Sequence, residues 1–141
     1  PANLFCADFM GNPTMNFIPC QGVKKDQAVE LTCRHFSVLF TPNQPLTLPA
    51  EGDYVLGVRP EFVKVKGDEG IEGTVISSLP SGMETTLSLA VKDITLSAVA
   101  FGSVDFAMDS VIHFGFEGDR YILFDAQSTE NLGLGSLQIL N

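Results

Sequence analysis

Apolar and polar positions alternate along most of the chain, and this pattern predicts a protein built mainly from β-strands. The clearest strand covers residues 84–91, where every second side chain is apolar or Thr. Turn-forming residues separate other short extended runs, at residues 15–20, 29–33, 36–40, 54–58, 62–66, 71–75, 94–101, 111–116 and 121–124. Short strands about ten residues apart, with turns between them, predict an antiparallel barrel or sandwich.

The two ends of the chain differ from this pattern. Ala2, Phe5, Cys6 and Phe9 recur at helical spacing before Gly11, which predicts a short N-terminal helix with one apolar face. We expect that face to pack on the barrel. Residues 132–141 (LGLGSLQILN) show no recognisable motif, and we interpret their glycine cluster as part of a flexible tail.

A proline interrupts the extended pattern in the middle of the chain. Pro60 has no N–H to give to a sheet and holds Arg59 away from helical geometry, while residues 62–66 are extended again. Arg59, Pro60 and Glu61 are therefore predicted to form a fixed corner between two strands. We expect the Arg59 guanidinium to stabilise this corner through nearby carbonyls or carboxylates.

Composition limits the classes of function. The 141 residues are 45% hydrophobic, which is enough for a core, and we predict one domain over residues 1–141. The formal net charge is −9 with eight Lys and Arg, which argues against binding to nucleic acid or anionic lipid. Cys6, Cys20 and Cys33 form no metal-binding spacing with the two histidines, so we expect free, mostly buried thiols and no metal.

No motif for catalysis is present in the sequence. A phosphate-binding loop needs G-x-x-x-x-G-K-[ST], and the nearest glycine cluster, at 133–136, lacks the lysine. The acidic residues are scattered through turns, which is typical of a solvated surface. We therefore predict that this chain is not itself an enzyme.

Three stretches carry a family resemblance. Residues 57–61 (GVRPE) are similar to the G-[IV]-R-P-E motif in the C-terminal regulatory domain of ABC-transporter ATPases. Residues 1–19 (PANLFCADFMGNPTMNFIP) resemble the segment that leaves the nucleotide-binding domain in the carbohydrate and glycerol-phosphate importers. Residues 116–125 (FEGDRYILFD) are similar to the family's closing F-x-x-[DE]-R-x-x-L-F-D strand. The turn before Glu84 departs from the family pattern P-L-G-x-E-T.

The resemblance implies a fold and a role. The fold is an OB-like antiparallel barrel of the transport-associated (TOBE) type, with residues 1–11 as the linking helix from an ATPase domain that precedes this chain. Such domains pair as homodimers in the cytoplasm, at the inner face of the plasma membrane, and some dock regulatory proteins. ATP, magnesium and the permease subunits would be bound by the missing ATPase domain. The alternative is a sensor of small ligands or oxyanions.

Two groups of candidate residues follow. The first group lies in the family motifs and is expected to be structural: Arg59, Pro60, Glu61, Glu84, Arg120, Phe124 and Asp125. The second group reflects an apparent excess of apolar residues over what one small core can bury. We predict that it forms a homodimer contact between residues 101 and 124: Phe101, Phe106, Phe114, Phe116 and Phe124.

Overall fold

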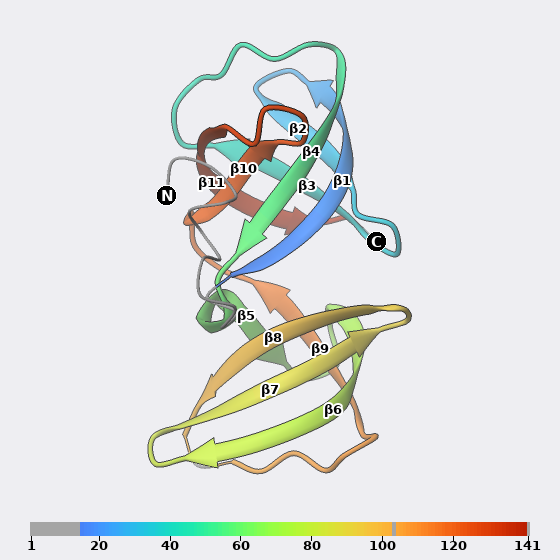
Figure 1. The fold of residues 1–141 in the computed structure, drawn as a ribbon, viewed down its shortest axis with the longest axis vertical. Coiled ribbons are helices and arrows are strands. Elements are labelled where there is room, and N and C mark those ends of the chain that lie inside the picture. Colours follow the sequence, from blue (N-terminus) through green and yellow to red (C-terminus); the bar gives the residue numbers. More distant parts are fainter. Residues whose placement is uncertain (1–14, 103, 141) are drawn as a thin grey trace. The chain divides into compact units, whose positions relative to one another are not determined.

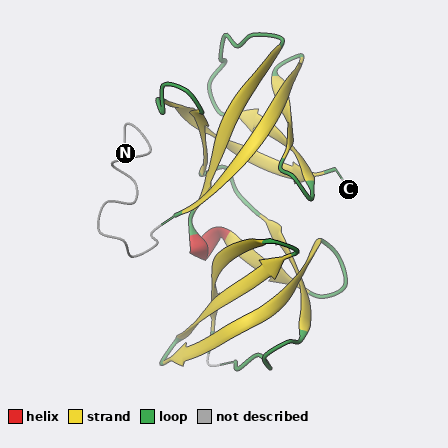
Figure 2. Cartoon of the chain, turned by 45° about the vertical axis from the view of Figure 1, so that its right-hand side comes forward, coloured by secondary structure: helices red, strands yellow, loops and turns green. Residues whose placement is uncertain are grey.

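The computed structural model describes residues 15–102 and 104–140. Strands make up almost all of its regular structure, as Figure 2 shows. The described residues divide into two compact units, one formed by residues 15–58 and 117–140 and the other by residues 59–102 and 104–116. The predicted mainly β fold is confirmed, but two units are present where the strand pattern indicated one barrel. The predicted N-terminal helix lies outside the described residues.

The first unit is a closed six-stranded antiparallel barrel (Figure 1). Its strands follow the order β1-β2-β3-β11-β10-β4 around the barrel. They comprise β1 (Asn16–Lys25), β2 (Ala28–Thr32), β3 (Ser37–Pro42), β4 (Glu51–Val58), β10 (Tyr121–Asp125) and β11 (Asn131–Ile139). A closed barrel has no unpaired edge, so each strand here has a neighbour on both sides.

The interpretation of residues 132–141 as a flexible tail is wrong. Strand β11 pairs with β10 on one side and with β3 on the other, and it thereby closes the barrel. Gly135 is needed for close approach, because a Cβ added there would lie 2.4 Å from the carbonyl oxygen of Thr41. Gly135 therefore permits tight packing of β11 against β3.

Strand β1 also runs further than the sequence indicated, through Pro19 to Lys25. Pro19 pairs with Val55 of β4, whereas the ladder between β1 and β2 begins only at Gln21. The missing N–H of Pro19 is tolerated because β1 has only one ladder neighbour at that point.

Buried side chains lie on both faces of β10. Leu123 is paired with Leu56 of β4, and both are fully buried on the inward face. Phe124 and Ile122 point the other way and form a separate cluster with Met15, against which Phe17 and Val55 pack. The rings of Phe17 and Phe124 meet edge to face at 6.0 Å.

The second unit is a five-stranded antiparallel sheet in the order β5-β9-β6-β7-β8. It begins with the 3₁₀ turn η1 (Pro60–Phe62) and contains β5 (Val63–Lys66), β6 (Ile71–Ser81), β7 (Glu84–Val91), β8 (Ile94–Phe101) and β9 (Val111–Phe116). The end strands β5 and β8 contact each other, so the sheet curves strongly. Its core contains Val63, Leu87, Leu89, Leu96 and Phe114.

The chain passes between the units at two of the recognised motifs. It leaves the first unit between Val58 and Arg59 and returns between Phe116 and Glu117. The predicted corner is confirmed at the first crossing, since β4 ends at Val58 and Arg59 is extended, with φ −65° and ψ 142°. The turn expected before Glu84 is made by Gly82 and Met83 alone, because β6 extends to Ser81.

Candidate interaction surface

Backbone hydrogen bonds hold the corner that follows β4. The N–H of Phe62 donates to the carbonyl of Arg59 at 2.9 Å, and the N–H of Val63 donates to the carbonyl of Pro60. Pro60 is buried, Glu61 is half-buried and the side chain of Arg59 is exposed. The role expected for the Arg59 guanidinium stays a prediction, because the hydrogen bonds seen at this corner belong to the backbone.

A second fixed turn precedes β10, in the closing motif. The hydroxyl of the fully buried Tyr121 donates to the carbonyl of Glu117 at 3.0 Å and accepts from its N–H at 2.8 Å. Burial raises the pKa of Tyr121 to about 12. Arg120 is exposed beside it. Tyr121 was not among the predicted site residues, although an aromatic residue with a polar tip at a turn is a usable signal.

Asp125 holds the turn between β10 and β11. Its Oδ2 accepts the N–H groups of Gln127 at 3.1 Å and of Ser128 at 2.7 Å. The backbone hydrogen bond from Ser128, followed by the other hydrogen bonds of this turn, lowers the pKa of the Asp125 carboxyl. This geometry agrees with the structural role predicted for Asp125.

The five phenylalanines predicted to form an interface do not lie on one surface. Phe114 and Phe124 are fully buried, in the second and first unit respectively, so they cannot contact a partner in the folded protein. Phe106 and Phe116 are half-buried, and the ring of Phe116 packs edge to face on Phe114 at 6.1 Å. Phe101 alone of the five is largely exposed, at 68%. The prediction assumed one core, whereas two cores take up most of the aromatic residues.

Phe101 belongs to an apolar patch on the outer face of the second unit, which we call the hairpin rim. Leu79 pairs with Thr86, and Glu84 pairs with Phe101, so these four side chains share the face opposite the core. Met83 lies in the turn between β6 and β7 and is 84% exposed, and Leu79 is 64% exposed. The hairpin rim therefore consists of Leu79, Met83, Glu84 and Phe101.

The segment after β8 is anchored beside the hairpin rim. The N–H of Gly102 donates to the carbonyl of Met83 at 2.6 Å, and the hydroxyl of Thr85 lies 2.7 Å from the carbonyl oxygen of Val104. The hydroxyl of Ser78 donates to Asp105 at 2.9 Å. Val104 itself is 53% exposed. The alternation of residues along each strand could have placed Leu79 and Phe101 on the outer face. The pairing of β6 with β7 and of β7 with β8 was needed to show that the two residues lie on the same surface.

A cation also lies beside the hairpin rim. The Nζ of Lys64 is 5.7 Å from the ring centroid of Phe101 and 6.0 Å from that of Phe62. Glu84, placed by the sequence analysis in a family motif, is exposed and lies across from Phe101 in the ladder. The surface thus combines exposed apolar side chains with one acidic and one basic group.

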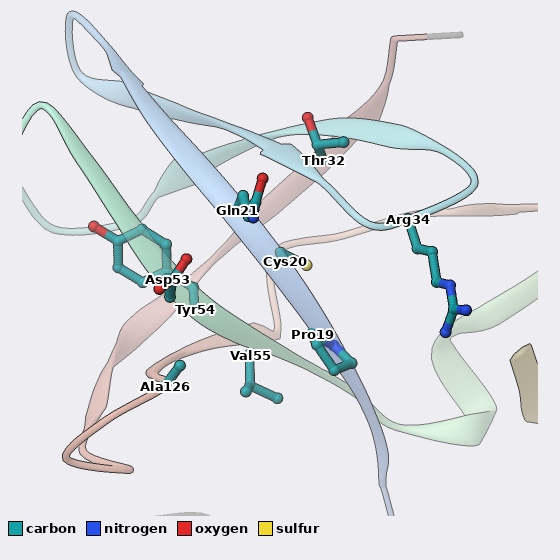
Figure 3. A pocket seen from close by; sticks show the side chains of 9 residues that line it. All are labelled: Pro19, Cys20, Gln21, Thr32, Arg34, Asp53, Tyr54, Val55 and Ala126. Carbon is teal, nitrogen blue, oxygen red and sulfur yellow. The ribbon is translucent and has the colours of Figure 1, made fainter.

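The barrel contains a separate pocket of about 440 Å³ (Figure 3). Figure 3 shows Pro19, Cys20 and Gln21 along β1 beside Asp53, Tyr54 and Val55 of β4. Arg34 and Asp53 line it with opposite charges. Desolvation first, and the Asp125 carboxylate second, raise the pKa of Tyr54. An oxyanion site needs hydrogen-bond donors and a positive potential, and the Asp53 carboxylate in this lining opposes the charge of Arg34.

The described residues contain neither a candidate metal site nor a membrane-spanning helix. Over residues 15–102 and 104–140, no group of three or more His, Cys, Asp or Glu side chains is placed to hold a metal ion. Within the same part of the chain, no helix has the length and apolar character needed to cross a bilayer.

Two protein-family models match overlapping parts of the sequence between residues 11 and 124. Residues 11–63 match the MalK OB fold domain, and residues 56–124 match the TOBE domain. The chain belongs to the family of MalK-type OB fold and TOBE domains. The two matches meet at residues 56–63, which include the corner where the chain passes from one unit to the other.

Relatives of this family are ABC transporter ATP-binding proteins. An uncharacterized one from Sinorhizobium fredii is 33% identical over 74% of this chain and 28% of its own length. The maltose/maltodextrin import protein MalK of Vibrio cholerae is 33% identical over 65% of this chain and 26% of its own length. The sn-glycerol-3-phosphate import protein UgpC of Cereibacter sphaeroides is 36% identical over 49% of this chain and 17% of its own length. The chain thus spans less than a third of each of these three relatives.

Proposed function

We propose that this MalK-type chain is the C-terminal regulatory and contact region of an ABC importer ATPase subunit. The observation that carries the proposal is the pair of adjoining OB fold and TOBE matches, together with relatives that are themselves ATP-binding subunits. The chain supplies no phosphate-binding loop, so its contribution is a rigid β scaffold with an exposed contact face.

The solute class is proposed from the relatives. Their names refer to maltose/maltodextrin and to sn-glycerol-3-phosphate import. Carbohydrate or glycerol-phosphate uptake is therefore the role we assign to the parent transporter. In it, the ATPase domain would bind ATP, magnesium and the permease subunits, and the whole subunit would lie in the cytoplasm against the membrane.

The hairpin rim is the face we assign to protein contact. Leu79 and Phe101 lie on the same face of the sheet, Met83 lies in the adjoining turn, and all three side chains are largely exposed. A second copy of the chain is the proposed occupant, and a cytoplasmic regulatory protein could use the same chemistry. Glu84 and Lys64 would then orient the partner by charge.

The reading frame that encodes the chain tests directly whether the chain is part of an ABC importer ATPase subunit. We expect a G-x-x-x-x-G-K-[ST] loop upstream of Pro1, within the same open reading frame. We also expect the purified 141-residue chain to show no magnesium-dependent ATP hydrolysis. A reading frame without that loop would overturn the parent assignment, and turnover abolished by a point change in this chain would overturn its non-catalytic role.

A further inference from the structure

Two cysteines that are distant in the sequence meet inside the barrel. Cys20 lies on β1 and Cys33 directly follows β2. The ladder pairs Gln21 with Thr32, so Cys20 and Cys33 occupy the next cross-strand position. Their Sγ atoms are 2.8 Å apart. Unbonded sulfur atoms ordinarily stay further apart than this, whereas a disulfide bond is about 2.05 Å long.

The surroundings of this pair suit a bond between the two sulfurs. Cys20 is 5% exposed and Cys33 is fully buried, so neither thiol meets bulk solvent freely. Neighbouring antiparallel strands place opposite Cα atoms about 4.5–5.5 Å apart. That range lies within the separation of about 4.4–6.8 Å that a disulfide requires.

The barrel pocket gives one of the two thiols access to small molecules. Cys20 is among the residues that line it, together with Pro19 and Gln21 on the same strand. Cys33 is not among the lining residues of this pocket. A molecule as small as hydrogen peroxide can therefore approach Cys20 through the pocket, while Cys33 stays behind it.

We propose that Cys20 and Cys33 form a reversible disulfide when the protein meets a peroxide. The Cys20 sulfur attacks one peroxide oxygen, and the O–O bond breaks. The other oxygen leaves as a first molecule of water, and Cys20 becomes a sulfenic acid. The Cys33 sulfur then attacks the Cys20 sulfur and forms the disulfide bond. The hydroxyl of the sulfenic acid takes up the Cys33 proton and leaves as a second molecule of water. The two thiols supply the two electrons that reduce the peroxide, and an added dithiol reverses the bond.

The reduced pair is expected to react slowly at neutral pH. The hydrogen bond with Cys33 first, and burial second, raise the pKa of the Cys20 thiol far above its usual value. The thiolate is the attacking species, so the rate should rise as the pH is raised. A dedicated peroxide sensor would react quickly, whereas this pair is expected to react slowly. The disulfide should therefore form only when the protein is exposed to peroxide for a long time.

Peptide mapping of the oxidised 141-residue chain tests the proposal. Trypsin cuts after Lys24, Lys25 and Arg34, so the expected product links residues 26–34 to the peptide that contains Cys20. That second peptide also contains Cys6, which makes Cys6→Ser the matched control. We expect Cys6→Ser to keep the link and Cys20→Ser or Cys33→Ser to lose it. The link should form faster at about pH 9 than at neutral pH.

Thermal melting supplies a readout that needs no variant. We expect the oxidised wild-type chain to melt at a higher temperature than the reduced chain, and a dithiol to restore the lower value. A wild-type chain that gives sulfinic acid on Cys20 with Cys33 still a free thiol would overturn the proposal. A link that is lost in Cys6→Ser, or no link at all after prolonged peroxide treatment, would do the same.

Discussion

At the residue scale, Asp125 links a family motif to the closure of the barrel. Its carboxylate accepts two backbone N–H groups, and its own N–H donates to the carbonyl of Glu130 at 2.9 Å. These contacts fix the connection between β10 and β11, the strand that closes the ring. The acid at this position of the motif is thus explained by turn geometry.

We expect Asp125→Ala to lower the free energy of unfolding by about 1–2 kcal/mol, because two N–H groups lose their acceptor. Urea denaturation followed by circular dichroism measures this change. Glu130→Ala is the matched control, since Glu130 is exposed in the same turn, and it should leave stability nearly unchanged. Equal effects of the two substitutions would contradict the role of Asp125.

The same residue predicts a pH dependence. The folded-state pKa of Asp125 is lowered, so its contribution is present above the unfolded-state pKa of about 3.9 and disappears as the pH falls through the folded-state value. The stability difference between wild type and Asp125→Ala should therefore be constant near neutral pH and shrink below about pH 4. A difference that grows on acidification would show that the carboxylate is not the stabilising form.

Tyr121→Phe removes only the hydroxyl that joins both backbone groups of Glu117. We expect a loss of about 1 kcal/mol at neutral pH. Because burial raises the pKa of Tyr121 to about 12, the wild type should also lose stability as the pH rises above about 10. Denaturation curves at several pH values should show a smaller alkaline loss in Tyr121→Phe, and an identical loss would exclude Tyr121 as its source.

At the element scale, β11 determines whether the first unit is a closed barrel. Gly135→Ala should destabilise this unit by about 1–3 kcal/mol, because the added Cβ would meet the Thr41 carbonyl and the Phe40 ring. Gly67→Ala is the control, since nothing lies within 4 Å of a Cβ there. Thermal melts of both variants measure the difference. If both variants melt like the wild type, close packing of β11 is not required.

Local patterns predicted most strands but not their partners. Residues 84–91 were found because their strict alternation matches a sheet with one buried face. Strand β11 was missed because its glycines look like a linker until Thr41 and Phe40 are known to lie against Gly135. Such a contact joins residues far apart in the sequence, and no periodicity within β11 itself reveals it.

At the scale of the whole molecule, the number of cores decides which aromatic residues remain for a partner. The sequence alone suggested one core and a surplus of phenylalanine, whereas Phe114 is fully buried in the second unit and Phe124 is fully buried in the first. Counting apolar residues therefore overstated the interface, and the family resemblance could not correct it. Of the five predicted phenylalanines, Phe101 alone stays largely exposed, and it lies on the hairpin rim.

Sedimentation equilibrium of the wild-type chain, Phe101→Asp and Val23→Asp tests the assignment of the hairpin rim most directly. Val23 is the matched control, since it is an exposed apolar residue on a strand of the other unit, at 42% against 68% for Phe101. Circular dichroism establishes that each variant is folded. We expect reversible self-association of the wild type and of Val23→Asp, and association weaker by about tenfold or more in Phe101→Asp. A wild type that stays monomeric at the highest concentration, or a folded Phe101→Asp that associates like the wild type, would contradict the account.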